Sequence, residues 1–296
     1  MTDVSILIAA RNERHLPRMV AHLHEALTGD YEIVVVQDGA PYQLLPDHPR
    51  LRVHNREYTG LKPSINFAAA QARGKYLLKL DAHCAVSEGI DEILPRAMEW
   101  NWMVVPRFYT LDDETWQPRD DRHCDYWYLD CPLTDPKGYR FRAGGYWFER
   151  TQARAAVGPL DETLTHHGSA WFVERAFFLD KLRGMQVEGY GLSYMEPADL
   201  GLRTWLGPWG GQVMVNKSCW YSHWHQQADT RGYGISMKEI RRAYRWTAEY
   251  WMRNAWPEAV HPLAWLIERF WPIPGWPDDW RAQQDEYERE HEWNPA

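Results

Sequence analysis

The stretch VSILIAARNE at residues 4–13, followed by EIVVVQDGA at residues 32–40, decides the fold class. Each stretch contains an unbroken run of β-branched and other apolar residues, which is typical of a strand buried on both faces of a parallel sheet. Between them, apolar residues recur at helical spacing until a glycine ends the pattern, at Leu16, Val20, Leu23, Leu27 and Gly29. The order strand, helix, strand predicts a β-α-β unit that begins at residue 4.

The alternation of strand and helix continues along the chain. We predict further strands at residues 51–55, 75–84, 103–108 and 210–216, and helices at 62–73, near 196–206 and at 238–253. This pattern predicts an α/β fold with a mostly parallel central sheet flanked by helices. In open sheets of this kind, ligands bind at the carboxyl ends of the strands.

The composition indicates a soluble globular chain. Of 296 residues, 45% are hydrophobic and 25% are charged, which excludes a disordered, collagenous or coiled-coil chain. The four cysteines lack the paired spacing of a disulfide framework. The first apolar run lacks the basic flank of a signal peptide, and no run reaches the ~20 apolar residues that span a membrane. We therefore expect a cytoplasmic protein.

Tryptophan is in excess, because the chain contains 18 Trp but only 8 Phe. This ratio favours amphipathic rings at surfaces over rings that only fill a core. Eight of the tryptophans follow residue 240, at Trp246, Trp251, Trp256, Trp265, Trp271, Trp276, Trp280 and Trp293. The carboxyl-terminal part therefore serves either as an aromatic platform that binds a ligand or as an aromatic clamp packed onto the rest of the chain.

The strongest chemical signal is the triplet Asp81-Ala82-His83, at the carboxyl end of the strand predicted over residues 75–84. A carboxylate and an imidazole two residues apart, leaving a strand together, can bind one divalent cation. The triplet alone is a weak motif, and its place at a strand end gives it weight.

With these motifs, residues 3–235 resemble the nucleotide-sugar-dependent glycosyltransferases of the GT-A fold, family 2-like. Several blocks match in order: VSILIAARNE, VVVQDGA, GLKPSINFAAAQARGKYLLKLDAHC, GSAWFVERAFF and EPADLGLRTWLGPWGG. Most members of that family have Asp-x-Asp at the metal site. The Asp-x-His found here is similar to that of the polypeptide N-acetylgalactosaminyltransferases, and the carboxyl-terminal blocks look like those of the same subgroup.

The resemblance implies a site for Mn²⁺ or Mg²⁺ formed by Asp81, His83 and His223. His223 and His225 alternate along an extended segment and so share one face. The resemblance favours His223 as the third ligand, whereas His225 fits a stacking or supporting role. A cation held there would neutralise charge on the diphosphate that leaves when a nucleotide-sugar is cleaved.

The resemblance also implies a donor site. Its residues are Ala9, Arg11, Glu13, Asp38, Lys62, Asn66, Asp81, Ala82, Trp171, Arg231 and Tyr233. Five of these have a plainer interpretation. Asp38 can form a turn before Gly39, Glu13 can cap the next helix, and Trp171 can fill the core. Arg231 and Tyr233 can belong to a surface turn at residues 231–234 rather than to a loop that closes over the diphosphate.

Glu196, Asp199 and Arg203 share one face of the helix predicted near residues 196–206. An intrahelical salt bridge explains this spacing. The resemblance instead places Glu196 beside the acceptor, where it would remove a proton from the attacking hydroxyl in an inverting displacement. The N-acetylgalactosaminyltransferase-like blocks fit retention, which needs no such base, so the stereochemistry stays open.

We therefore expect a metal-dependent glycosyltransferase with a UDP-sugar donor, a catalytic domain at residues 1–235 and a mainly helical extension at residues 236–296. The acceptor is a hydroxymethylated DNA base, a saccharide or lipid-linked sugar, or a peptide hydroxyl. The basic helix at residues 238–253 favours DNA, since it could grip phosphates, whereas the acidic residues 278–292 oppose it. A non-catalytic binding protein on the same fold is the alternative of another class. A nucleotidyltransferase fits less well, because AARNERH lacks a glycine-rich phosphate loop.

Overall fold

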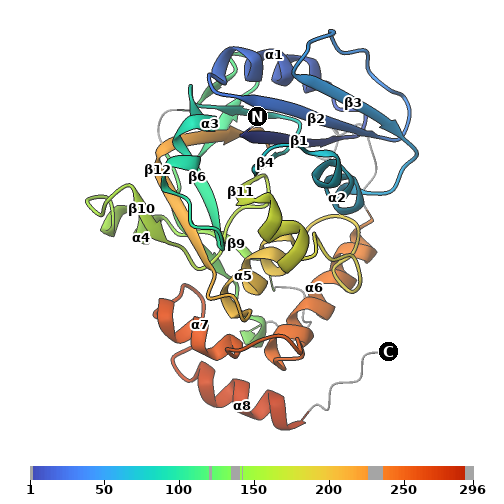
Figure 1. Cartoon of the computed structure of the whole chain (residues 1–296). Coiled ribbons are helices and arrows are strands. Elements are labelled where there is room, and N and C mark those ends of the chain that lie inside the picture. The colour runs from blue at the N-terminus through green and yellow to red at the C-terminus, as the bar shows by residue number, and fades with distance from the viewer. Residues whose placement is uncertain (1–2, 120–121, 135–140, 142, 226–235, 291–296) are drawn as a thin grey trace.

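The computed structural model describes residues 3–119, 122–134, 141, 143–225 and 236–290. A mixed sheet runs through the molecule in the strand order β10-β12-β6-β11-β4-β1-β2-β3, and β5 and β7 pair at its side (Figure 1). The strands of this sheet are β1 (Val4–Ala10), β2 (Tyr31–Asp38), β3 (Leu51–Arg56), β4 (Tyr76–Leu80), β5 (Cys84–Val86), β6 (Trp102–Asp112), β7 (Gln117–Pro118), β10 (Leu160–Glu162), β11 (Ala170–Glu174) and β12 (Gln212–His223). A separate pair joins β8 (Trp127–Leu129) to β9 (Ala143–Tyr146).

Among the described residues, six strands of this sheet run in one direction, as the strand patterns predicted, whereas β5, β7, β10 and β11 run antiparallel to their neighbours. β1 pairs in parallel with β2 and with β4, β2 pairs in parallel with β3, and β12 with β6. One central strand is reversed, because β11 enters antiparallel between β4 and β6. The strand predicted over residues 75–84 is in fact two short strands, since β4 ends at Leu80 and β5 begins at Cys84. The strand predicted over residues 210–216 continues much further, to His223.

Helices cover both faces of the sheet. Neighbouring residues of β2 point to opposite sides: Ile33 and Val35 pack with α1 (Leu16–Ala26), whereas Val34 and Val36 pack with α2 (Leu61–Gln71). The other helical segments are α3 (Ile90–Ile93), η1 (Pro95–Ala97), η2 (Pro132–Thr134), α4 (Phe148–Ala153), η3 (Phe177–Lys181), η4 (Pro197–Gly201), α5 (Leu202–Leu206), α6 (Met237–Met252), α7 (Leu263–Phe270) and α8 (Trp280–Glu290). In the described part of the chain, no helix has the length and apolar character needed to cross a membrane.

The carboxyl-terminal helices α6, α7 and α8 gather at the end of the molecule away from α1 (Figure 1). Their apolar faces join the same core as α2 and β11. Trp251 is 1% exposed, and Trp276 donates from Nε1 to the carbonyl of Leu129 at 2.6 Å. Gly189 lies directly under the ring of Trp246, where a Cβ atom would come within 2.1 Å of the indole. These contacts match the clamp interpretation of the aromatic extension.

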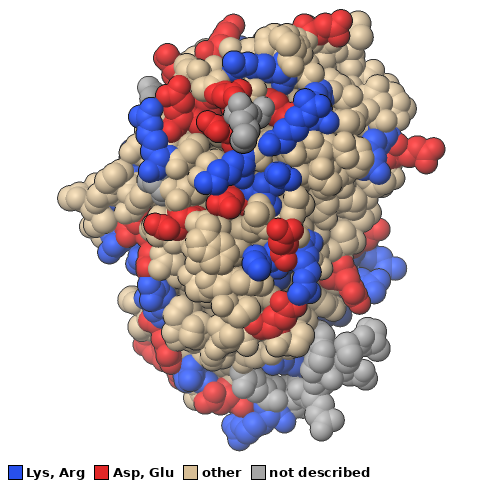
Figure 2. All heavy atoms as spheres, viewed as in Figure 1, with Lys and Arg blue, Asp and Glu red and all other residues tan. Residues whose placement is uncertain are grey.

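The expectation that the tryptophans form exposed stacking surfaces is wrong for the described residues. Trp100, at 48% exposure, is the one described tryptophan that is largely exposed. The others are buried or half-buried, because a chain with several layers of helix around one sheet offers many apolar contacts to a large ring. On the face drawn in Figure 2, Lys and Arg side chains alternate with Asp and Glu, without a broad patch of either sign.

Candidate active site

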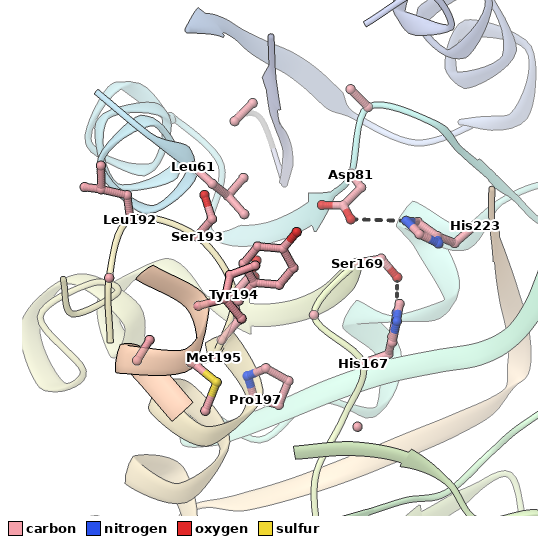
Figure 3. Close-up of a pocket in the computed structure, with 18 of the residues that line it drawn as sticks. Leu61, Asp81, His167, Ser169, Leu192, Ser193, Tyr194, Met195, Pro197 and His223 are labelled. Carbon is pink, nitrogen blue, oxygen red and sulfur yellow. Dashed lines mark hydrogen bonds and ion pairs between the residues drawn. The ribbon is translucent and has the colours of Figure 1, made fainter. Parts of the chain in front are cut away.

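A cavity of about 800 Å³ lies at the carboxyl ends of β1, β2 and β4 (Figure 3). Parallel strands bring their carboxyl ends to one edge of the sheet, which explains why the loops after these strands meet there. The lining comes from the segments 9–13, 81–83, 144–146, 167–169, 191–197 and 236–244, together with single residues that include Asp38, Tyr58, Leu61, Tyr128, His223 and His225. Since 236–244 belongs largely to α6, the carboxyl-terminal extension forms one wall of the cavity.

Asp81, His83 and His223 converge on one side of this cavity. Their ligand atoms lie within 4.8 Å of one another, with 3.0 Å between the Nε2 atoms of the two histidines and 3.3 Å between His223 Nε2 and Asp81 Oδ2 (Figure 3). Two atoms bound at adjacent positions of an octahedral ion with ~2.1 Å bonds lie about 3 Å apart. The three side chains therefore fit a single divalent cation.

The pairing of two strands explains why His223 reaches Asp81, 142 positions earlier in the chain. β5 pairs antiparallel with β12, and His223 stands opposite Cys84, the residue that follows His83. The turn 81–83 and the end of β12 are therefore neighbours by strand register. Burial lowers the pKa of His223 to about 3, so its imidazole is neutral at pH 7 and keeps a lone pair for a cation.

Glu13 has a role that the sequence did not suggest. His83 Nδ1 donates to Glu13 Oε2 at 3.0 Å, so Nε2 of the same ring presents its lone pair to the cation site. The other oxygen of Glu13 accepts from the backbone N–H of His15 at 3.1 Å, which holds the carboxylate in place. Glu13 thus holds the turn before α1 and orients a metal ligand, and it does not cap the helix itself.

His225 stands apart from the three-residue cluster. Its Nε2 lies 3.0 Å from the hydroxyl of Tyr146, and its ring lies edge-on to that of His223. His167 lines the same wall, with Nδ1 2.5 Å from Ser169 Oγ (Figure 3). Both rings support the cavity wall beside the cation site.

Beneath the cation site, Lys79 joins two carboxylates. Its side chain is 0% exposed, and Nζ lies 2.7 Å from Asp81 Oδ1 and 3.2 Å from Glu196 Oε2. Burial alone would lower the pKa of Lys79, but Asp81 and Glu196 raise it above its usual value, so the lysine is charged. Burial would likewise raise the pKa of Asp81, but Lys79 and then His223 lower it well below its usual range.

Glu196 lines the cavity at the start of η4, as the resemblance implied. Trp171 Nε1 donates to Glu196 Oε2 at 3.1 Å. Burial raises the pKa of Glu196, and Lys79 opposes that rise. The two residues before Glu196 are strained, since Tyr194 and Met195 have left-handed backbone angles of φ 66° and 57° although neither is glycine. Figure 3 shows the side chains of Tyr194 and Met195 at the cavity, and Glu196 lines it as well.

Asp199 and Arg203 are not among the described residues that line the cavity. Arg203 Nε donates to Asp199 Oδ1 at 2.7 Å, which is the intrahelical salt bridge that their spacing allows. Arg203 also donates to the carbonyls of Leu182 and Gly184, and Asp199 accepts from the backbone N–H of Gln186. The pair therefore holds the segment 182–186 against η4, and any effect on the reaction passes through that segment.

The expected nucleoside side of the donor site is partly occupied by protein contacts. The Arg11 guanidinium lies 3.9 Å from the centre of the Tyr58 ring, and both line the cavity with Ala9 and Ala82. Asp38 also lines it, but its carboxylate accepts from the backbone N–H groups of residues 59 and 60, at 2.7 and 2.9 Å. Asp38 thus fixes the loop before α2 rather than a turn at Gly39.

Three expected donor residues lie behind the wall instead of in it. Lys62 donates to the carbonyl of Gln186 at 2.9 Å, and the Asn66 amide pairs with both backbone groups of Met185. Trp171 is 0% exposed and stacks on Phe178, as in the core interpretation, and reaches the site only through Glu196. Direct contact of these three residues with a donor is therefore not supported by the geometry. Arg231 and Tyr233 lie outside the described residues.

Sequence reasoning missed Lys79, His167, Tyr194 and Met195. Lys79 carried a signal, because it is the one charged residue within the apolar strand YLLKL. A lysine is almost never fully buried without a partner, so its position predicts a nearby carboxylate. The others are scattered through the chain, and no local pattern marks them.

Comparison with known proteins agrees with this geometry. The family model described as "Glycosyl transferase family 2" matches residues 5–158. A Drosophila melanogaster protein named "Putative polypeptide N-acetylgalactosaminyltransferase 13" is 33% identical over 135 residues, which cover 38% of this chain and 24% of that protein. The chain thus spans about a quarter of the length of this curated relative.

Two solved structures share the fold. "GalNAc-T7 with UDP, GalNAc and Mn2+" superposes with a TM-score of 0.65 at 15% identity, over 90% of this chain and 54% of the other. "S. aureus TarS 1-349 in complex with UDP-GlcNAc" superposes with a TM-score of 0.50 at 13% identity, over 98% and 71%. The expected GT-A-like α/β architecture is therefore confirmed. Together with the match over more than half of the sequence, these findings show that the chain belongs to glycosyl transferase family 2.

Proposed function

We propose that this protein transfers a sugar from a nucleotide-sugar, a UDP-sugar, to an acceptor hydroxyl, and that transfer requires Mn²⁺ or Mg²⁺. The observation that carries the proposal is the convergence of Asp81, His83 and His223 on the wall of a cavity in a family 2 chain. The UDP complexes of two proteins with the same fold support the choice of donor.

In this proposal Asp81, His83 and His223 hold the cation, which neutralises charge on the diphosphate leaving group. Glu13 orients His83, and Arg11 with Tyr58 forms the nucleoside side of the cavity. The wall of residues 191–197 covers the transferred sugar and keeps water from the reacting carbon.

Glu196 is the carboxylate that faces the transferred sugar. In an inverting reaction it removes the proton of the acceptor hydroxyl, and its pKa, raised by burial, favours that role. In a retaining reaction Glu196 instead accepts hydrogen bonds from sugar hydroxyls. Lys79 and Trp171 donate to its oxygens and hold the carboxylate in place for that contact. The anomeric configuration of the product decides between the two roles.

We propose a hydroxymethylated DNA base as the acceptor, entering beside α6. One side of this helix lines the cavity, at Ser236, Glu239, Ile240, Ala243 and Tyr244. Four exposed cations lie within eight consecutive residues of this helix, at Lys238, Arg241, Arg242 and Arg245. Such a group can contact phosphates, and the tyrosines of the cavity can stack on an exposed base. Saccharide, lipid-linked and peptide acceptors share the site chemistry and are the other outcomes of the test.

The test incubates the protein with duplexes containing hydroxymethylated or unmodified bases, with a panel of UDP-sugars, and with Mn²⁺ or EDTA. We expect a mass increase of one sugar residue on the modified duplex alone, and only with the metal. Hydrolysis of a UDP-sugar without any DNA product would support transfer but overturn the DNA acceptor. Binding of UDP without turnover on any acceptor would favour the non-catalytic class.

A further inference from the structure

Lys79 is a buried ammonium at the centre of the sheet, and it is not among the described residues that line the cavity. Its strand, β4, lies between β1 and β11, where Lys79 stands beside Leu7 and Trp171. Moving a charged group from water into such a place costs many kcal/mol unless partners compensate. A charged lysine at this position is therefore stable only when nearby carboxylates or carbonyls compensate its charge.

The partners use every donor that the ammonium has. Lys79 Nζ donates to Asp81 Oδ1 at 2.7 Å, to the carbonyl of Gly168 at 2.6 Å and to Glu196 Oε1 at 3.3 Å. A lysine ammonium has three N–H groups, so none is left over. The two carboxylates come from different elements, since Asp81 follows β4 and Glu196 precedes η4.

The contacts of Lys79 determine which carboxylate oxygens of Asp81 and Glu196 can bind a ligand in the cavity. With Asp81 Oδ1 held by Lys79, the other oxygen of Asp81 faces His223 and the cation site. Glu196 is held from below by Lys79 and from the side by the Trp171 indole. One buried cation thus sets the position of a metal ligand relative to a second carboxylate that lines the same cavity.

We propose that Lys79 is a positioning residue that holds Glu196 in a fixed place relative to the metal ligand Asp81. The inference rests on the proposed metal-dependent transfer, and it names the residue that aligns the metal ligand Asp81 with Glu196. Alignment matters because a displacement of about 1 Å at a reacting group can lower a rate by about 100-fold.

The test compares Lys79→Met, which keeps the length of the side chain but removes the charge and the donors, with Lys217→Met as a matched control. Lys217 is half-buried on β12, and its Nζ donates to the carbonyls of residues 154 and 157. The first readout needs no turnover: the indole N–H signal of Trp171 in a ¹⁵N spectrum, assigned with Trp171→Phe. We expect this signal to shift in K79M, because Glu196 moves away from the indole, and to stay unchanged in K217M.

The second readout is kcat at saturating Mn²⁺. We expect K79M to lose about 100-fold and K217M to stay within about twofold of the wild type. In a background of Glu196→Gln, adding K79M should cost less than about threefold, because the residue that Lys79 positions is already impaired. Titration of Mn²⁺ without nucleotide should give K79M an affinity within about threefold of that of the wild type. Loss of the nearby ammonium favours metal binding, whereas loss of the hydrogen bond that holds Asp81 disfavours it, so the two effects oppose each other.

Several results would overturn the proposal: an unmoved Trp171 signal, kcat within threefold of wild type, full recovery of K79M by excess Mn²⁺, or additive effects of K79M and E196Q. If K79M does not fold, Lys79→Gln replaces it, with the same shift of the Trp171 signal and a smaller loss of kcat. If the wild type transfers no sugar to any acceptor, the proposed function fails, while the Trp171 signal still tests the role of Lys79.

Discussion

Two ion clusters lie at η4, one at its start and one within it, and they illustrate the difference between a site and a structural support. One joins Lys79 to Asp81 and Glu196, and the other joins Asp199 to Arg203. Each contains a buried carboxylate, Glu196 in one and Asp199 in the other, with a cation within hydrogen-bond distance. Spacing along the chain does not separate them, since Glu196, Asp199 and Arg203 all share one helical face.

The two clusters differ in whether their polar atoms face the cavity or are all bonded within the cluster. Arg203 ends on Asp199 and two backbone carbonyls, and the second oxygen of Asp199 accepts from Gln186, so this cluster is closed. In the other cluster, Asp81 Oδ2 turns toward His223 and Glu196 lines the cavity. A site is marked by polar atoms that converge on open space, and a support by polar atoms that satisfy each other.

The largest expected effect separates the two clusters by activity. Asp81→Ala should lower kcat by about 10³-fold and abolish Mn²⁺ binding by calorimetry, because it removes a ligand and the charge that the cation needs. His223→Ala should do the same. Asp47→Ala, at an exposed carboxylate, is the control and should match the wild type. Metal-dependent transfer that survives in both site variants would contradict the assignment of the cation site.

The second effect concerns stability. Arg203→Met should lower the free energy of unfolding by about 3–5 kcal/mol, because it leaves the buried Asp199 carboxylate without its cation. Urea unfolding measures the loss, and kcat per folded molecule should stay within about threefold of wild type. If R203M folds normally but loses 100-fold in kcat, Arg203 acts on the substrate after all and the contrast between the clusters collapses.

A smaller effect tests whether Glu13 belongs to the cation site. Glu13→Gln should weaken Mn²⁺ binding by roughly 10–100-fold, because His83 loses the carboxylate that orients its ring. Calorimetric titration of Mn²⁺ checks this, with the melting temperature as control for the fold. An unchanged affinity would place Glu13 outside the metal site.

The smallest effect concerns His166, a buried ring beside Gly201 of η4. Burial lowers its pKa to about 4, from 6.5 in an unfolded chain. Between these values the unfolded chain binds a proton that the folded one does not, so stability falls as the pH falls. From pH 6.5 to 5.5 this amounts to about 1 kcal/mol. Unfolding at several pH values should show a shallower slope for His166→Gln, and equal slopes would refute the assignment.

Much of the fold follows from local pattern. The buried strands β1 and β2 and the helices α1 and α2 lie at the residues where apolar runs and helical spacing predicted them. The limit of β4 at Leu80 was missed, because KYLLKLDAHC stays apolar on both sides of the turn that carries the triplet. The reversal of β11 was also invisible, since strand direction depends on the path of the chain and not on hydrophobicity.

The candidate site was foreseen in part. The triplet at residues 81–83 and the partner His223 came from a strand-end motif together with a family resemblance, and the structure brings these side chains together. Lys62, Asn66 and Trp171 lie behind the cavity wall, because a matching position in a motif does not say whether a side chain faces a ligand or the core.

The amino-acid order alone established the alternation of strands and helices and the placement of a carboxylate and an imidazole at a strand end, because both depend on residues within one or two turns of each other. Tertiary packing decided that Glu13 orients His83, that Lys79 joins Asp81 to Glu196, and that α6 closes the cavity. These contacts join residues 70 and more than 100 positions apart, Glu13 to His83 and Lys79 to Glu196. Strand register and burial create these contacts, and a short stretch of sequence determines neither of them.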